Sequence, residues 1–202
     1  MVLGLGATAY ADPIGPDCGA GSCFGSIYTL TSSLISAGAA TSTYNFTLTV
    51  DTSGYTGAGS GLEAVAIKTV SNSSDMTSPS LLSGPGTFTT AALDGLNANG
   101  CAGPSPSGFL CTQSSSATGV AVPNGTYTFV FQGTVANGTL LTASGAASVK
   151  ALYVDDTGKQ AGLTSAPITI QPGAVPIPGT ASLFGAGFAG FLAWQRTQRF
   201  LS

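Results

Sequence analysis

The clearest pattern in this sequence is an alternation of apolar and polar residues between positions 44 and 50. Tyr44, Phe46, Leu48 and Val50 fall on one side of an extended chain, and Asn or Thr residues fall between them. A period of two is typical of a half-buried antiparallel strand. We therefore predict a strand at residues 44–50.

Similar runs rich in Val, Ile, Thr, Tyr or Phe predict further strands. They cover residues 26–33, 62–70, 86–93, 126–135, 146–155 and 166–171. Turn-forming sequences such as Asn99-Gly100, Asn124-Gly125 and Asn137-Gly138 separate several of them. No stretch before residue 177 has a convincing helical period. The pattern predicts an all-β fold, with one antiparallel β-sandwich of immunoglobulin-like or jelly-roll type.

The apolar side of these runs supplies the predicted core. Its members are Tyr28, Tyr44, Phe46, Leu48, Val50, Val65, Ile67, Phe88, Tyr127, Phe129, Phe131, Val149, Ala151, Tyr153, Ile168 and Ile170.

The C-terminal stretch has a different pattern, with no ionisable side chain from Thr180 to Trp194. A helix of this length is just long enough to cross a hydrocarbon layer of roughly 30 Å. Arg196 and Arg199 follow it, and positive charge beyond an apolar span favours the cytoplasmic side. We predict a transmembrane helix at residues 180–195 and a basic cytoplasmic tail at 196–202; a buried core helix is the alternative.

The N-terminal residues end in Ala9-Tyr-Ala11, directly before Asp12. Small residues at these positions are typical of the cleavage site of a secretory signal peptide. The basic segment that normally opens such a peptide is missing, so residues 1–11 are interpreted as a truncated signal peptide, with an edge strand as the alternative. This division leaves residues 12–171 as one ectodomain and residues 172–179 as a spacer rich in Pro and Gly.

Four cysteines lie in two close pairs, Cys18 with Cys23 and Cys101 with Cys111. An even number of cysteines in an exported chain indicates disulfides, and proximity favours bonding within each pair. A four-thiolate zinc site is the alternative, but the spacings of the cysteines fit it poorly. We expect two structural disulfides and no metal.

Only 6% of the 202 residues are charged, and the chain contains no histidine. Three lysines against eight carboxylates leave the region before the tail weakly acidic, so nucleic acid is excluded as a partner. Without histidine the chain cannot build a Ser-His-Asp or Cys-His system. We therefore expect no enzymatic activity and no cofactor.

Other arrangements of the few ionisable residues remain as weaker alternatives. An enzyme would need Glu63 beside Asp94 or Asp155, or a serine paired with Lys68 or Lys150. Calcium could bind at Asp155 and Asp156, or at Asp51 with Asp94. Asp and Gly are also ordinary turn-forming residues, and we favour that role for these carboxylates.

The weak candidate for a ligand-binding ring is Tyr55, in a loop that is rich in glycine. Sugar-binding faces are often built from exposed rings, and the only Trp lies in the C-terminal stretch. We predict that Tyr55 is exposed.

The C-terminal stretch resembles the PEP-CTERM sorting signal. The similarity lies in Val175, Pro176, Ile177 and Pro178, the apolar segment with its glycines, and the terminal arginines. It is most similar to the variant that reads Val-Pro-Leu-Pro-Ala, with Ile177 and Gly179 in place of Leu and Ala. The main form has Glu between the prolines, from which Ile177 departs.

This resemblance implies a Gram-negative bacterium that makes exopolysaccharide, and an exosortase in the inner membrane that recognises the motif and cleaves near it. More loosely, the Cys18-to-Cys23 opening and residues 51–55 and 96–101 are similar to PEP-CTERM ectodomains. A cleaved glycosylphosphatidylinositol tail is the competing explanation, but such a tail normally ends the chain.

These features together predict an exported structural protein of the cell surface or the exopolysaccharide matrix. The C-terminal signal implies that it is held in the inner membrane and passed to an exosortase. The alternative is a polysaccharide-binding β-sandwich module with Tyr55 at its groove.

Overall fold

The computed structural model describes residues 12–18, 23–104 and 108–172. They form strands and one short 3₁₀ turn, η1 (Ser73–Asp75). The strands are β1 (Ile27–Ala37), β2 (Thr41–Asp51), β3 (Gly61–Lys68), β4 (Met76–Ser83), β5 (Asp94–Asn97), β6 (Gly100–Pro104), β7 (Phe109–Gln113), β8 (Val120–Ala121), β9 (Thr126–Ala136), β10 (Ala147–Val154), β11 (Gln160–Ile168) and β12 (Gln171–Pro172). The predicted all-β fold is confirmed for this part of the chain.

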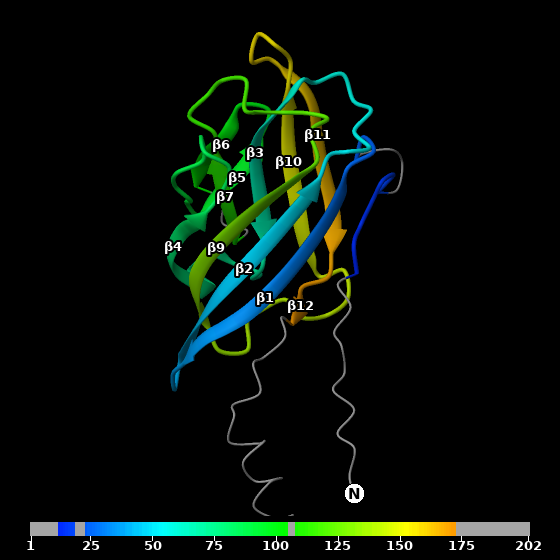
Figure 1. Cartoon of the computed structure of the whole chain (residues 1–202). Helices are drawn as coiled ribbons and strands as arrows, with labels where there is room; N and C mark the ends of the chain where they lie inside the picture. The colour runs from blue at the N-terminus through cyan, green and yellow to red at the C-terminus, as the bar shows by residue number, and fades with distance from the viewer. Residues whose placement is uncertain (1–11, 19–22, 105–107, 173–202) are drawn as a thin grey trace, which may run out of the picture.

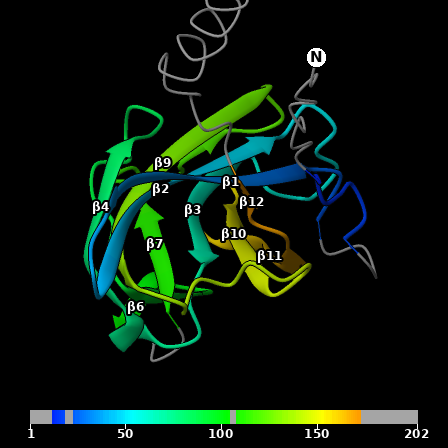
Figure 2. The ribbon, with the colours of Figure 1, turned by 90° about the horizontal axis from the view of Figure 1, so that it is seen from below.

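Two sheets pack face to face, as Figures 1 and 2 show. The first sheet has the order β12-β1-β2-β9-β4, and the second has the order β11-β10-β3-β7 with β8 added to β3. Neighbouring strands are antiparallel except β12, which runs parallel to β1. In immunoglobulin sandwiches the fourth and fifth strands are neighbours in one sheet, whereas β4 here lies beside β9.

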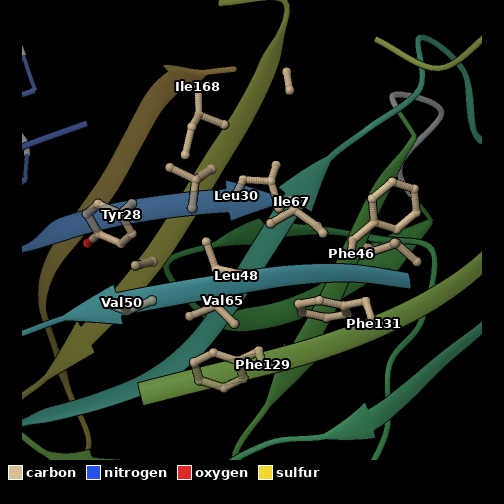
Figure 3. Packing of buried hydrophobic residues seen from close by; sticks show 14 of the residues in the cluster. Tyr28, Leu30, Phe46, Leu48, Val50, Val65, Ile67, Phe129, Phe131 and Ile168 are labelled. Carbon is tan, nitrogen blue, oxygen red and sulfur yellow. The ribbon is translucent and has the colours of Figure 1, made fainter. Parts of the chain in front are cut away.

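The alternating pattern produces the core because one side of each strand faces the opposite sheet. Phe46 and Leu48 of β2 and Phe129 and Phe131 of β9 are fully buried against Val65 and its neighbours in the second sheet (Figure 3). The predicted core residues are buried, apart from Tyr44 and Tyr127, which are partly buried at its margin. Burial of this apolar surface is the main stabilising contribution in such a sandwich.

The second sheet is also covered on its outer side. The β5–β6 hairpin lies over it, and Leu96 of the hairpin packs with Ala64, Ala66, Phe109 and Leu152. Because both sides of β3 and β7 are buried, these strands lack a clean alternation. The apolar run of β3 was still predicted as a strand, but the shorter β7 was missed.

Two strand predictions need correction, and the strands β4, β5, β6 and β8 were not predicted. β4 was missed because Pro79 and a register shift interrupt it, which an edge strand tolerates. The run at residues 86–93 is not a strand; it forms isolated bridges at Phe88 and Ala92, and it closes the core with the Phe88 ring. The run at residues 166–171 is divided, because it ends β11 in the second sheet and begins β12 in the first sheet.

The predicted spacer begins inside the fold, because Pro172 pairs with Ser32 of β1 as part of β12. The rest of the spacer, the sorting motif, the transmembrane helix at 180–195 and the signal peptide at 1–11 lie outside the described residues. Among residues 12–18, 23–104 and 108–172, no helix is long and apolar enough to span a bilayer.

Replacement of a core ring gives a direct test of the packing. Phe129→Ala should lower the free energy of unfolding by about 3–5 kcal/mol, because Phe129 is fully buried and packs edge-on against Phe88 at 5.0 Å. Urea denaturation measures this loss. The control is Thr128→Val, because the neighbouring Thr128 side chain faces outward. This substitution should change the free energy of unfolding by no more than about 0.5 kcal/mol. A loss below about 1 kcal/mol for Phe129→Ala would contradict the packing.

Candidate functional site

Tyr55 is not exposed, so the sequence-based prediction for this residue is wrong. Only 7% of its surface is accessible, and its ring stacks on Tyr153 with a centroid distance of 4.4 Å. The backbone N–H of Gly59 donates to the Tyr55 hydroxyl at 3.1 Å. The loop glycines serve this burial, since a Cβ at Gly57 would collide with the Tyr55 ring. Tyr55 therefore offers no platform for a sugar.

Beneath Tyr55, buried hydroxyl groups connect the two sheets. The hydroxyl oxygens of Tyr28 and Tyr153 lie 2.7 Å apart. The Tyr28 hydroxyl also lies 3.2 Å from the Thr164 hydroxyl, and the Tyr153 hydroxyl lies 2.9 Å from the Ser26 hydroxyl. These hydrogen bonds satisfy polar groups that would otherwise be costly to bury.

Burial also fixes the protonation state of these tyrosines. Desolvation raises the pKa of Tyr28 and of Tyr153 above the ordinary value. For Tyr153, the neighbouring Tyr28 adds to this increase. Both phenols therefore stay neutral at physiological pH. In this arrangement they join the two sheets through hydrogen bonds.

Two of the four carboxylates considered as calcium ligands, Asp155 and Asp51, hold turns, whereas Asp94 begins β5. Asp155 accepts hydrogen bonds from the backbone and hydroxyl of Thr157, at 2.8 and 2.7 Å, and from the backbone of Lys159 at 3.0 Å. The hydroxyl bond, followed by the backbone bonds, lowers the pKa of Asp155. Asp51 accepts from the backbone N–H of Ser53 at 2.9 Å, and this bond lowers its pKa. In the described part of the chain, no three His, Cys, Asp or Glu side chains cluster closely enough to hold a metal ion.

Two of the ionisable residues considered for an enzyme, Glu63 and Lys150, help to hold the β5–β6 hairpin to the second sheet. Glu63 accepts a hydrogen bond from the Gln113 amide at 2.8 Å, and the Gln113 carbonyl accepts from the backbone N–H of Cys101 at 3.0 Å. Lys150 donates to the Leu96 carbonyl at 3.3 Å and lies over the Phe109 ring, 4.8 Å from its centroid. These contacts position a hairpin.

The cysteines bond as their proximity in the sequence predicts, Cys18 with Cys23 and Cys101 with Cys111. Cys23 is fully buried in the main core, whereas Cys111 belongs to the cluster under the β5–β6 hairpin. The Cys101–Cys111 disulfide joins β6 to β7. It therefore fixes the hairpin to an edge of the second sheet.

One surface was not recognised from the sequence: the outer side of the first sheet, here called the polar face. Cross-strand pairing places side chains of its strands in rows, because directly opposed residues point to the same side. The polar face consists of Thr29, Thr31, Ser33, Thr43, Asn45, Thr47, Thr49, Thr77, Ser80, Ser83, Thr128, Gln132 and Thr134, with the apolar side chain of Val130 between Thr47 and Ser83 in one row. None of these residues is buried, and none is ionisable.

The polar positions of residues 44–50 already contained part of this signal, since Asn45, Thr47 and Thr49 alternate with core residues. The neighbours of these residues could not be inferred, because strand order is not visible in a sequence. The fold places β1 on one side of β2 and β9 on the other, which extends the polar positions across the sheet (Figure 1).

Comparison with known proteins adds little to this geometry. No protein-family model matches the chain, and no curated protein matches its sequence. A crystal structure of the major pilin subunit of Bacillus cereus is similar over 72% of this chain, with 12% sequence identity and a TM-score of 0.32. The match covers 40% of the pilin chain, so this chain spans less than half of that protein.

Removal of one phenol hydroxyl tests the buried connection between the sheets. Tyr153→Phe should lower the free energy of unfolding by about 1–3 kcal/mol, because it leaves the hydroxyls of Tyr28 and Ser26 without a shared partner in a dry interior. The matched control is Tyr44→Phe, since the Tyr44 hydroxyl makes no side-chain hydrogen bond to the described residues. Equal stabilities of the two variants in urea would contradict the role assigned to Tyr153.

Proposed function

We propose that this chain is an exported, non-enzymatic structural protein of the cell surface or the exopolysaccharide matrix. The two disulfides are the observation that carries the proposal. Structural disulfides persist in oxidising compartments outside the cytoplasm. Export therefore explains why all four cysteines are paired inside a folded domain.

The described polar groups support a structural role. The buried phenols connect two sheets, Asp51 and Asp155 hold turns, and Glu63 helps to hold a hairpin. Each of these groups contributes to the fold through a partner within the same domain. The alternative was a polysaccharide-binding module with Tyr55 at its groove. Tyr55 does not support it, because the ring is buried.

The route to the surface is the second part of the proposal. The resemblance of residues 175–178 to a PEP-CTERM motif supports recognition by an exosortase after insertion of residues 180–195 in the inner membrane of a Gram-negative bacterium. Arg196 and Arg199 then hold the tail on the cytoplasmic side. On this route the folded domain is connected to the sorting motif through the residues that follow Pro172 of β12.

Intact-mass measurement tests the route. The membrane fraction should contain a chain that begins at Asp12, because Ala9-Tyr-Ala11 forms the signal-peptidase site. The medium or matrix should contain a shorter chain that ends near the Val175–Pro178 motif. Replacement of both motif prolines, Pro176→Ala with Pro178→Ala, should leave the membrane form and abolish the shorter one. Recovery of the protein in the cytosol with Met1 in place would overturn the proposal.

Loss of the second disulfide tests its structural role. Cys101→Ser with Cys111→Ser should lower the free energy of unfolding by about 2–4 kcal/mol, because the disulfide restricts the unfolded chain and fixes the β5–β6 hairpin. Urea denaturation measures the loss. The wild-type chain in reductant should lose at least as much, since both disulfides then open. An unchanged midpoint in the variant would show that the hairpin holds without the bond.

A further inference from the structure

The polar face is large, open and free of charge. Its rows run across four strands, for example from Ser33 through Asn45 and Gln132 to Ser80. Within a row, residues on neighbouring strands are about 4.8 Å apart. Successive rows are about 6.8 Å apart along each strand. The carboxylate of Asp51 lies one position beyond Thr49 on the same side, so charge begins only at the end of the face.

Many hydroxyls on this face are available to a ligand. Thr43 and Thr134 bond to each other at 3.0 Å, and the Gln132 amide donates to the Asn45 carbonyl at 2.9 Å. By contrast, five threonine hydroxyls in the middle rows make no side-chain hydrogen bond to the described part of the chain. They belong to Thr29, Thr31, Thr47, Thr49 and Thr128.

We propose that the polar face binds an uncharged polysaccharide. A threonine hydroxyl both donates and accepts hydrogen bonds, as does the hydroxyl of a sugar, so the two surfaces match without any charge. An acidic polymer would gain nothing here, because the face has no lysine or arginine and the whole chain has a formal charge of −3. A neutral polymer fits the electrostatics of the molecule.

The shape of the face favours a polymer over a small sugar. Small ligands bind in concave sites that bury most of their surface, whereas this site is the open side of a sheet. An extended polymer can contact several rows at once, and many weak contacts then add to a useful affinity. The face has no aromatic ring for stacking, so binding depends on hydrogen bonds along the rows. The proposal adds a ligand to the structural role and is independent of the sorting signal.

Polar residues also cover the solvent side of many antiparallel sheets that bind no ligand, so the test must remove hydroxyls without disturbing the sheet. The double variant Thr47→Val with Thr49→Val does this, because valine has nearly the shape of threonine and suits a strand. The matched control is Thr89→Val with Thr90→Val, since both residues are exposed but lie in a loop outside the first sheet. Thermal unfolding confirms that both variants fold.

Affinity electrophoresis of the full chain measures binding directly. The native gels contain hydroxyethyl cellulose, galactomannan or dextran as neutral polymers, and dextran sulfate as a charged comparator. We expect at least one neutral polymer to retard the wild-type chain, equally at low and high salt. The Thr47 and Thr49 double variant should bind about tenfold more weakly, because two hydrogen bonds are lost. The loop variant should match the wild type.

Three outcomes would overturn the proposal: no retardation by any of the neutral polymers, equal retardation of the double variant and the wild type, or retardation by dextran sulfate alone that disappears with salt. Each of these results would leave the proposed export and surface role intact, because intact mass and cell fractionation test that role separately. Failure of the export test, in turn, would not change the electrophoresis result.

Discussion

Contact between the inner faces of the two sheets is the constraint on which the rest of the structure depends. Neither sheet can bury its aromatic and branched side chains without the other, so Phe46 and Phe129 of the first sheet require Val65 and Ile67 of the second. Tyr28 and Tyr153 add a polar link inside this buried contact, where a missing partner would be costly. The link thus favours one relative position of the sheets over alternatives of similar apolar content.

The outer faces of the two sheets have different surroundings. The β5–β6 hairpin covers the second sheet, so apolar residues occur on both sides of β3 and β10. The first sheet keeps its outer side open, and hydroxyl and amide groups occupy it around the side chain of Val130. With only 6% charged residues in the chain, hydration here depends on neutral polar groups. The same chemistry that keeps this face wet makes it suited to a hydroxylated ligand.

The sequence predicted best where one side of a strand meets the core and the other meets water. β2 and β9 show this alternation and were placed within one to three residues of their ends. The signal failed where tertiary contacts changed the meaning of an apolar residue. Phe88 lies in a loop, and its ring closes one end of the core. Tyr55 is enclosed by glycines, which in the sequence suggested an exposed loop. Pairing between distant strands, which creates the polar face, has no local signature.

Both ends of the folded part are attached to the same edge of one strand. Ile14 exchanges two backbone hydrogen bonds with Tyr28, at 2.9 and 2.8 Å, and β12 pairs with Thr31 and Ser32 of β1. The described chain therefore enters and leaves the sandwich along one edge of β1, and the long β1–β2 ladder occupies the other edge of that strand. Separation of β1 from this edge would release both end segments together, so this one edge couples the two ends of the described fold.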